Sequence, residues 1–326
     1  MIKKQRTKSL KLLKLEVILN RLLLNHPSMH DIRNEYSKSH TGHIGEESLD
    51  FHLSELQHDV FDILHDLRLL RVSSKKYYFQ IDCLLVHPQF CLLLEVKNMI
   101  GDLYFDHQFD QMIRTRNGVK ETFSDPVIQV ELQKEYFAKW LIQNKFSKIP
   151  LYTLVVITNP RSHISLSPLY EKAKAEKIVR GRVLASKIRE FINTPSDIIL
   201  EKKDMNRLSA KLFKQHEPNN SDLLSIYNIH PDDIQTGVIC PYCGNLPMIR
   251  TYGNWFCSSC QKRSKTAHIQ AIQDYSLLFD KNVKNKALRK FLHISSRNSM
   301  KKLLFSMGIL PGGNTNSATY KLPLPK

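Results

Sequence analysis

The sequence lacks three features that mark common classes of protein. It has no run of 18 apolar residues, so we expect no segment that crosses a bilayer. Its N-terminus (residues 1–24) is basic and then apolar, but Lys11, Lys14 and Glu16 interrupt the apolar run and no small-residue cleavage site follows. We therefore expect an amphipathic helix there rather than a signal peptide. Finally, we find no internal repeat and no long low-complexity tract.

Acidic residues are also scarce, since 31 Asp and Glu stand against 48 Lys and Arg, which gives a formal charge of +17. This excess favours a polyanionic partner, either nucleic acid or an anionic membrane surface. The 326 residues exceed one average domain, so two or three domains are expected. Six cysteines without an export signal indicate a reducing compartment, and we expect a cytoplasmic protein.

Residues 77–97 predict two apolar strands joined by a tight turn at residues 87–90. Asp82 interrupts the first strand, and Glu95 and Lys97 interrupt the second. With a two-residue loop at Pro88-Gln89, or a four-residue loop at residues 87–90, Asp82 pairs directly with Glu95 on one face of the ladder. Lys97 lies two residues after Glu95 and therefore shares that face.

Two carboxylates about 5 Å apart repel each other unless a cation or a shared proton lies between them. A divalent metal with oxygen ligands suits this position, and a neighbouring lysine can orient a water or neutralise charge on a phosphate. The alternative is an exposed hairpin whose solvated face carries the three charges. The apolar residues on both faces of the strands argue against it, because buried charges need partners.

We expect an amphipathic helix to begin within residues 42–47, and a further carboxylate, Glu46, lies at this start. Its apolar residues Leu49, Leu53 and Leu56 recur at helical spacing, and Glu46 lies on the same inward face. Glu46 is therefore a candidate to complete a metal site with Asp82 and Glu95. Alternatively, it only interacts with the dipole at the helix N-terminus.

A second helix is predicted over residues 126–144, with Asp125 as its N-cap and Pro126 at its first position. Its first turn carries Gln129, which by its position alone is more often an ordinary polar residue than a site residue. Residues 151–158 predict a buried strand, so that helices and strands together indicate an α/β core. The polar residues 215–222 are the best linker candidate.

Together these motifs resemble the nuclease-related domain (NERD) family, over about residues 41–160. The motifs that carry the resemblance are Gly42…Gly45-Glu46, Gln80-Ile81-Asp82, Glu95-Val96-Lys97-Asn98 and Pro126…Gln129. The pattern Asp82 with Glu95-Val96-Lys97 is similar to the core of the PD-(D/E)xK nuclease superfamily, although Ile81 stands where the proline that names the motif would be.

The resemblance implies a restriction-endonuclease-like fold, with a mixed sheet flanked by helices, and metal-dependent cleavage of nucleic acid. It implies that Asp82, Glu95 and the backbone carbonyl of Val96 bind Mg²⁺ or Mn²⁺, with Glu46 as a further ligand. It also implies that Lys97 positions the attacking water and that Gln129 faces the active site.

Two Cys-x-x-Cys pairs near the C-terminus predict a zinc ribbon: Cys240 with Cys243, and Cys257 with Cys260. Residues 248–256 between them predict a hairpin with a Gly-Asn turn. Disulfides do not suit a reducing compartment, and a redox motif would not occur twice, so we expect a structural Zn²⁺. Cys83 and Cys91 lie in apolar strands and are expected to be small buried residues.

Residues 261–303 carry 11 Lys or Arg against 2 Asp. Helices are expected over residues 269–278 and near 283–292, and a third should begin at Ser295 or Ser296, before a hairpin at 310–322. This order resembles a helix-turn-helix unit, whose recognition helix would present Arg297, Asn298, Lys301 and Lys302 to nucleic acid. The alternative is a solvated, charged helical cap on the ribbon.

The sequence thus predicts five segments: a basic helical segment (1–40), a nuclease-like α/β domain (41–200), a helical linker (201–235), a Cys₄ zinc ribbon (236–266) and a basic helical tail (267–326). The predicted function is metal-dependent hydrolysis of nucleic acid, with DNA favoured over RNA, and a homodimer would suit the cutting of duplexes. The alternatives are a non-catalytic nucleic-acid-binding protein on the same fold and a membrane-peripheral protein that uses its N-terminal helix.

Overall fold

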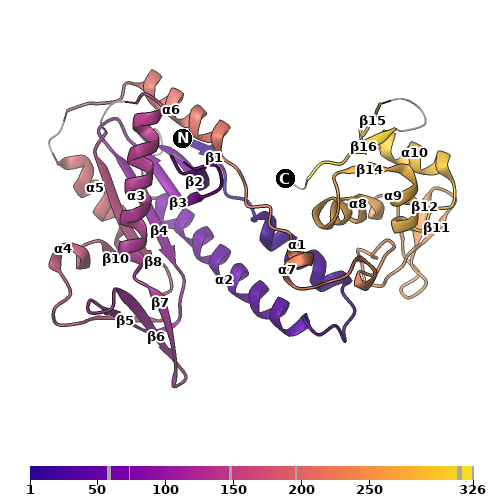
Figure 1. Cartoon of the computed structure of the whole chain (residues 1–326), viewed down its shortest axis with the longest axis horizontal. Coiled ribbons are helices and arrows are strands. Elements are labelled where there is room, and N and C mark those ends of the chain that lie inside the picture. Colours follow the sequence, from indigo (N-terminus) through magenta and orange to yellow (C-terminus); the bar gives the residue numbers. More distant parts are fainter. Residues whose placement is uncertain (57–59, 73, 147–148, 195–196, 314–317, 325–326) are drawn as a thin grey trace. The chain divides into compact units, whose positions relative to one another are not determined.

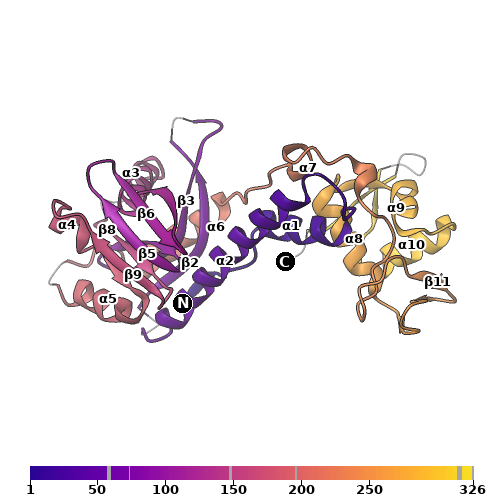
Figure 2. The ribbon, with the colours of Figure 1, turned by 90° about the horizontal axis from the view of Figure 1, so that it is seen from below.

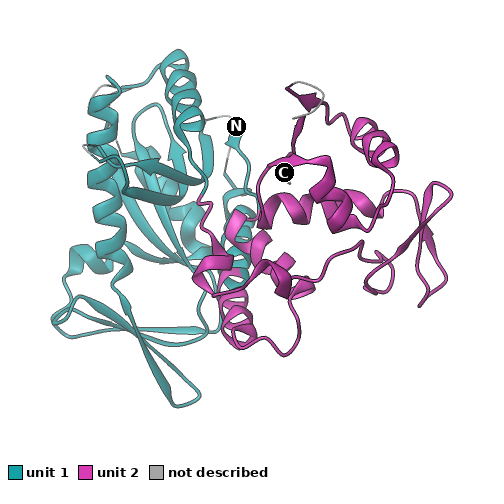
Figure 3. Ribbon diagram, turned by 45° about the vertical axis from the view of Figure 1, so that its right-hand side comes forward, with its two compact units in different colours: residues 1–7, 40–218 teal, residues 8–39, 219–326 magenta. Residues whose placement is uncertain are grey.

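The computed structural model describes residues 1–326 apart from 57–59, 73, 147–148, 195–196, 314–317 and 325–326. The chain divides into two compact units. The first contains residues 1–7 and 40–218, and the second contains residues 8–39 and 219–326 (Figure 3). The N-terminal 40 residues therefore contribute to both units.

A six-stranded mixed sheet forms the centre of the first unit (Figure 1). Its strands, in spatial order, are β1 (Ile2–Lys4), β2 (Asp62–Leu70), β3 (Tyr78–Val86), β4 (Cys91–Lys97), β8 (Leu151–Ile157) and β10 (Ile178–Arg180). The pairs β2–β3 and β3–β4 are antiparallel, whereas β1–β2, β4–β8 and β8–β10 are parallel. The parallel strands β4, β8 and β10 therefore have their C-terminal ends on the same side of the sheet.

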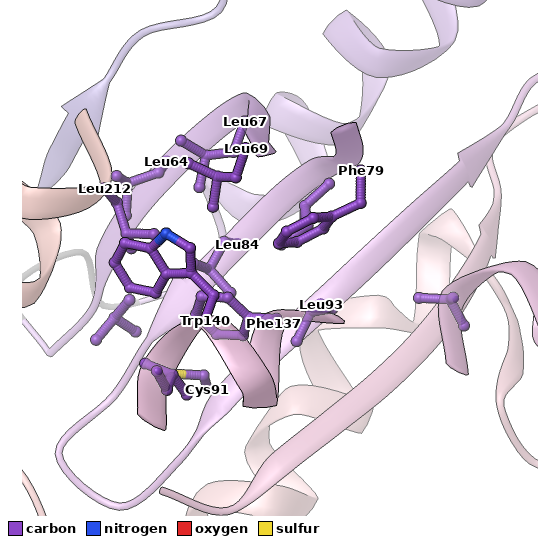
Figure 4. Close-up of a cluster of buried hydrophobic side chains, with 14 of the residues drawn as sticks. Leu64, Leu67, Leu69, Phe79, Leu84, Cys91, Leu93, Phe137, Trp140 and Leu212 are labelled. Carbon is purple, nitrogen blue, oxygen red and sulfur yellow. The ribbon is translucent and has the colours of Figure 1, made fainter. Parts of the chain in front are cut away.

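Helices cover both faces of this sheet, as Figure 2 shows for α3 and α5. On one face, α3 (Pro126–Gln143) and α6 (Lys202–Gln215) pack on alternate strand residues such as Leu84 and Leu93, in the cluster drawn in Figure 4. On the other face, α2 (Met29–Leu53) and α5 (Leu184–Asn193) pack on the intervening residues such as Leu85 and Leu92. The predicted α/β class, with a mixed sheet flanked by helices, is confirmed.

Helix α3 begins as the sequence predicts. The side chain of Asp125 accepts a hydrogen bond from the N–H of Val127 at 2.7 Å, and Pro126 occupies the first turn. The buried Asp125 also accepts a hydrogen bond from the hydroxyl of Tyr170 at 2.6 Å. Both interactions satisfy a carboxylate that would otherwise be costly to bury.

Helix α2, in contrast, begins at Met29 and not within residues 42–47. The prediction that Glu46 lies at a helix N-terminus is therefore wrong, and a helix dipole cannot explain this carboxylate. Gly42 and Gly45 each weaken a helix, because glycine has low helix propensity. The helix continues through both of them, which indicates that tertiary contacts outweigh this weakening.

A second sheet of the first unit is formed by β7 (Val119–Ser124), β6 (Gln111–Arg116), β5 (Gly101–Asp106) and β9 (Ser162–Leu166), in that order. Strands β6 and β7 are joined by Asn117-Gly118, both with positive φ (51° and 77°), which is typical of a two-residue hairpin turn. Leu103, Phe105 and Met112 anchor this sheet to the core. The remaining elements of the unit are α4 (Lys172–Ala175) and the 3₁₀ turn η1 (Gly181–Val183).

His87 lies at the turn of the β3–β4 hairpin, stacked on Phe90 with ring centroids 4.7 Å apart and close to Phe61 at 5.0 Å. It is 4% exposed, and its burial lowers its pKa to about 4. In the unfolded chain, His87 binds a proton near pH 6.5, whereas in the folded chain it stays neutral until about pH 4. The free energy of unfolding therefore falls as the pH falls from about 6.5 towards 4.

We therefore expect His87→Phe to remove roughly 2 kcal/mol of this acid destabilisation. The measurement is urea unfolding at pH 7.5 and 4.5, followed by Trp140 fluorescence in a Trp255→Phe background. His163→Gln, at an exposed histidine, is the matched control and should leave the pH dependence unchanged. An equal loss of stability in His87→Phe and in the parent would contradict the prediction.

The second unit is built around the helices α1 (Leu10–Arg21), α8 (Ala267–Leu278), α9 (Asn285–Leu292) and α10 (Arg297–Ser306), with the short α7 (Leu223–Ile226) and η2 (Pro231–Asp233). The N-terminal amphipathic helix is confirmed as α1, which buries Leu12, Leu15 and Ile18. Arg21 of α1 is fully buried and pairs with Asp274 of α8 at 2.7 Å. This ion pair ties segments that are about 250 residues apart in the sequence.

Two small sheets complete the second unit. One consists of β11 (Ile249–Thr251), β12 (Asn254–Phe256) and β13 (Arg263–Ser264), and the other of β14 (Asn282–Lys284), β16 (Thr319–Lys321) and β15 (Pro311–Gly312). The first hairpin turns at Tyr252-Gly253, with φ of 38° and 86°, and not at Gly-Asn as predicted. The sequence also missed β14, where a helix start was expected. Part of the predicted C-terminal hairpin, residues 314–317, lies outside the described residues.

No helix among the described residues has both the length and the apolar composition needed to cross a membrane.

Candidate active site and cysteine cluster

The β3–β4 hairpin sets the geometry of the candidate active site. Its ladder runs from Val86–Cys91 to Cys83–Leu94, and Asp82 and Glu95 follow directly after its last pair. The hairpin closes with a hydrogen bond from the N–H of His87 to the carbonyl of Phe90 at 2.8 Å. This is the register that the sequence predicts from the turn.

Asp82 is half-buried, and one of its oxygens accepts a hydrogen bond from the N–H of Val96 at 2.9 Å. Burial raises the pKa of Asp82 well above its usual range, and the neighbouring carboxylates Glu95 and Glu46 raise it further. The Val96 N–H and Lys97 oppose this effect only in part. The charged form of Asp82 is therefore unfavourable here unless a cation compensates it.

Glu95 is buried, with 2% of its surface exposed, and both of its carboxylate oxygens have partners. Lys97 donates to one oxygen at 2.6 Å, and Gln133 of α3 donates to the other at 2.8 Å. The side chain of Lys97 also donates to Gln129 of α3 at 3.1 Å. The first two turns of α3 thus hold the acidic residue and the lysine in fixed positions.

Glu46 approaches the site from α2 and is held by Arg6, whose guanidinium donates to it at 2.7 Å. The same guanidinium binds Asp50 through two hydrogen bonds of 3.1 Å. Burial raises the pKa of Glu46 to about 7; Arg6 opposes this shift, while Asp66 and Glu95 reinforce it. Glu46 therefore belongs to the same group of interacting carboxylates as Asp82 and Glu95.

The close approach of α2 to the site depends on Gly45. A Cβ at this position would lie 2.2 Å from the Cβ of Asn98, directly after β4. Asn98 in turn donates to the carbonyl of Thr41 at 2.9 Å and accepts a hydrogen bond from Asn159 at 2.9 Å. The glycine therefore allows α2 to pack against the end of β4 and so brings Glu46 near Asp82.

We expect Gly45→Ala to destabilise the first unit by about 1–3 kcal/mol, because the added methyl group overlaps Asn98. Gly42→Ala is the matched control in the same helix, since nothing lies within 4 Å of its added Cβ. It should instead stabilise the helix by about 0.5–1 kcal/mol. Thermal unfolding of both variants gives the two signs, and the same sign in both would refute this account of Gly45.

The donor set of Glu46, Asp82 and Glu95 fits a hard divalent cation such as Mg²⁺ or Mn²⁺, because it consists of carboxylate oxygens whose negative charges are only partly neutralised. Within the part of the chain that the structure describes, the cysteines alone bring three or more potential ligand atoms within 4.8 Å of one another. The three carboxylates do not converge that closely. A metal ion held by all three would require these side chains to move closer together.

Sequence reasoning missed two residues of this site, Arg6 and Gln133. Arg6 lies 40 residues before Glu46, and no local pattern connects the two. Gln133 was detectable, because it follows Gln129 by four residues on α3 and therefore lies on the same helix face. Val96 contributes its N–H to Asp82, while the role of its carbonyl as a ligand stays a prediction.

The four cysteines of the second unit form a separate cluster. The Sγ atoms of Cys240 and Cys260 are 3.7 Å apart, and those of Cys243 and Cys257 are 3.6 Å apart. All four lie within 4.8 Å of one another. Tetrahedral Zn²⁺ with Zn–S bonds of about 2.3 Å places its sulfurs about 3.8 Å apart, so the cluster is compatible with a structural zinc ion. A disulfide, at about 2.05 Å, does not fit.

The basic residues predicted to bind nucleic acid lie on α10 of the second unit. Ser296 caps this helix by accepting from the N–H of Ser299 at 3.2 Å, and Met300, Leu303 and Leu304 bury its inner face. The predicted contact residues are all exposed: Arg297, Asn298, Lys301 and Lys302. They belong to a different unit from the carboxylates, and their role in binding stays a prediction.

Comparison with known proteins supports the resemblance for one part of the chain. Residues 41–158 match the family model described as NERD, nuclease-related domain. No curated protein and no solved structure matches the chain. The matched region begins within α2, just before Glu46, and ends just after β8, so it contains the hairpin and the first turns of α3. Residues 41–158 of this chain are therefore similar to the nuclease-related domain (NERD) family.

Proposed function

We propose that this protein is a metal-dependent nuclease that hydrolyses phosphodiester bonds of nucleic acid, with DNA as the favoured substrate. One observation carries the proposal: Asp82 accepts a hydrogen bond from the N–H of Val96, directly after Glu95, and Lys97 is hydrogen-bonded to Glu95 at 2.6 Å. A structural role would be served better by apolar residues, since burying like charges costs free energy.

In this proposal, Asp82 and Glu95 hold Mg²⁺ or Mn²⁺, with Glu46 as a further candidate ligand. Bound at these residues, the metal would lower the pKa of a water and stabilise charge on the phosphate. Lys97 donates a hydrogen bond to the attacking water or to a non-bridging oxygen, for which its compact charge is suited. Gln129 and Gln133 fix the positions of Lys97 and Glu95.

The second unit would bind the substrate. A structural zinc ion at the cysteine cluster would hold the ribbon, and the exposed cations of α10 would contact phosphates. Helices α8, α9 and α10, with β14 between the first two and β15 and β16 after the third, favour a helix-turn-helix unit over a simple charged cap. A homodimer would place two active sites on a duplex, and this too is a proposal.

The test is a cleavage assay on single- and double-stranded DNA and RNA, each with Mg²⁺, with Mn²⁺ and with EDTA. We expect metal-dependent loss of substrate, and Lys97→Ala should slow it by about 10²-fold or more. Lys120→Ala, at an exposed lysine of β7, is the control for loss of one positive charge. If no substrate is cut but all bind, a non-catalytic binding protein on this fold replaces the nuclease.

A further inference from the structure

We infer that Arg116, Arg161 and Arg180 of the first unit form a phosphate-binding site for the substrate backbone, next to the carboxylates. This inference rests on the proposed function and adds a positioning role to residues outside its catalytic group. Two of the three, Arg161 and Arg180, lie beyond the matched family region, which ends at residue 158.

The three arginines lie around one pair of strand ends. Strand β5 begins at Gly101 and pairs with Ser162 at the start of β9. A Cβ on Gly101 would lie 3.3 Å from the Cβ of Arg116, and the N–H of Gly101 donates to the carbonyl of Arg161 at 3.5 Å. The guanidinium of Arg180 donates to the carbonyl of Ser162 at 2.6 Å. Arg116 and Arg161 thus have their backbones at this strand pair, and Arg180 of β10 reaches it with its side chain.

The cluster lies near the C-terminal ends of β4, β8 and β10, where the candidate active site also lies. Ile157 of β8 pairs with Lys97 on one side and with Arg180 on the other. Paired residues on neighbouring strands share a face, so Arg180 projects on the face that carries Glu95 and Lys97. At about 4.8 Å per strand, the backbone of Arg180 is about 10 Å from that of Lys97.

The positive charge of the cluster is not compensated. Within the described ranges of the chain, none of the three arginines forms a salt bridge, and nearby acidic residues such as Glu121 and Asp102 pair with other residues. Glu121 lies on β7 two residues after Val119, which pairs with Arg116, and it already forms an ion pair with Arg114. Asp102 alternates with Gly101 along β5 and therefore lies on the opposite face.

Arginines without an acidic partner are suited to bind the phosphodiester backbone. Their guanidinium groups form paired hydrogen bonds with phosphate oxygens, and Arg116 and Arg161 are exposed while Arg180 is half-buried. With a rise of about 3.4 Å per nucleotide, a separation of about 10 Å reaches phosphates within about three nucleotides of the one cleaved. The cluster would therefore hold the strand beside the scissile phosphate and fix its register on the carboxylates.

The experiment measures binding apart from cleavage. The full chain carries Asp82→Asn to prevent cutting, and its binding to fluorescein-labelled 30-nucleotide DNA, single-stranded and duplex, is followed by fluorescence anisotropy over a range of KCl concentrations. Arg180→Gln should weaken binding about fivefold and lower the slope of log K against log[KCl] by about 1. The triple variant with Arg116→Gln and Arg161→Gln should lower the slope by about 2–3.

Arg189→Gln is the matched control, because Arg189 of α5 also donates to a backbone carbonyl, that of Glu55 at 3.1 Å. It lies towards the other edge of the sheet, where its neighbour Phe191 stacks on Tyr152 at the start of β8. An affinity and a salt slope in the triple variant equal to those of Arg189→Gln would overturn the inference. If the arginine variants do alter the slope while the unmodified chain cuts no substrate, the phosphate site stands and the proposed hydrolysis falls.

Discussion

Asp82→Asn should abolish cleavage and, at the same time, leave the first unit at least as stable as the unmodified chain. The loss of one carboxylate from the metal site should reduce the rate by about 10³-fold or more, since metal catalysis contributes several kcal/mol. Stability should not fall, because burial and the neighbouring Glu95 and Glu46 already disfavour the charge of Asp82. Asparagine keeps an oxygen that can accept the hydrogen bond from Val96.

The same variant tests the metal without any assay of activity. Mn²⁺ at 100 times its Kd should stabilise the unmodified chain by about 2.7 kcal/mol, and this should appear as a rise in the Tm of the first unit. The rise should disappear in Asp82→Asn and persist in Asp204→Asn, at a carboxylate of α6 that pairs with Arg207. A full stabilisation by Mn²⁺ in Asp82→Asn would show that the metal binds elsewhere, and the proposed hydrolysis would lose its basis.

Cys257→Ser should unfold the ribbon of the second unit and leave the first unit folded. Cys257 is buried beside Trp255 in the core of the second unit, and the N–H of Cys260 lowers the pKa of its thiol to about 7, which favours the thiolate that Zn²⁺ binds. Structural zinc contributes about 10–16 kcal/mol in small zinc domains. Without it, short strands such as β11 and β12 bury too little apolar surface to stay folded.

The measurements are zinc content by mass spectrometry and limited proteolysis with identification of the cut sites. The unmodified chain should carry one Zn²⁺, and Cys257→Ser should carry none and be cut within residues 236–266. Cys91→Ala is the matched control, because Cys91 is equally buried but lies in β4 of the first unit. It should keep its zinc. Proteolysis of the first unit in Cys257→Ser would contradict this prediction.

The elements that the sequence predicted correctly depend on local rules. The β3–β4 register follows from a short turn and from the two-residue period of strands, which together leave few ways to pair Asp82. The start of α3 follows from an aspartate cap before a proline. The cysteine cluster follows from the spacing of two Cys-x-x-Cys pairs, because a knuckle of that length presents two thiolates to one ion.

The elements that the sequence did not reveal depend on contacts between distant segments. The start of α2 was misplaced because helix propensity penalises Gly42 and Gly45, whereas the packing of Gly45 on Asn98 requires a residue without a side chain. The hydrogen bond from Arg6 to Glu46 leaves no periodic trace, since the two residues lie on separate elements. The arginines near Gly101 come from β6, the β8–β9 connection and β10, and only strand pairing brings them together.

The sequence by itself determined which reactive groups this protein carries: an Asp-Glu-Lys hairpin, four clustered cysteines and an excess of positive charge. Residue types and short-range spacing suffice for these, because each follows from composition or from residues at most 20 positions apart. The tertiary structure decided how the carboxylates are arranged, which partners hold them and where uncompensated arginines gather. Those features arise from pairing and packing between separate segments, such as Lys97 and Gln129, 32 residues apart, and Arg6 and Glu46, 40 residues apart. The free energy of such contacts is not encoded in any local pattern.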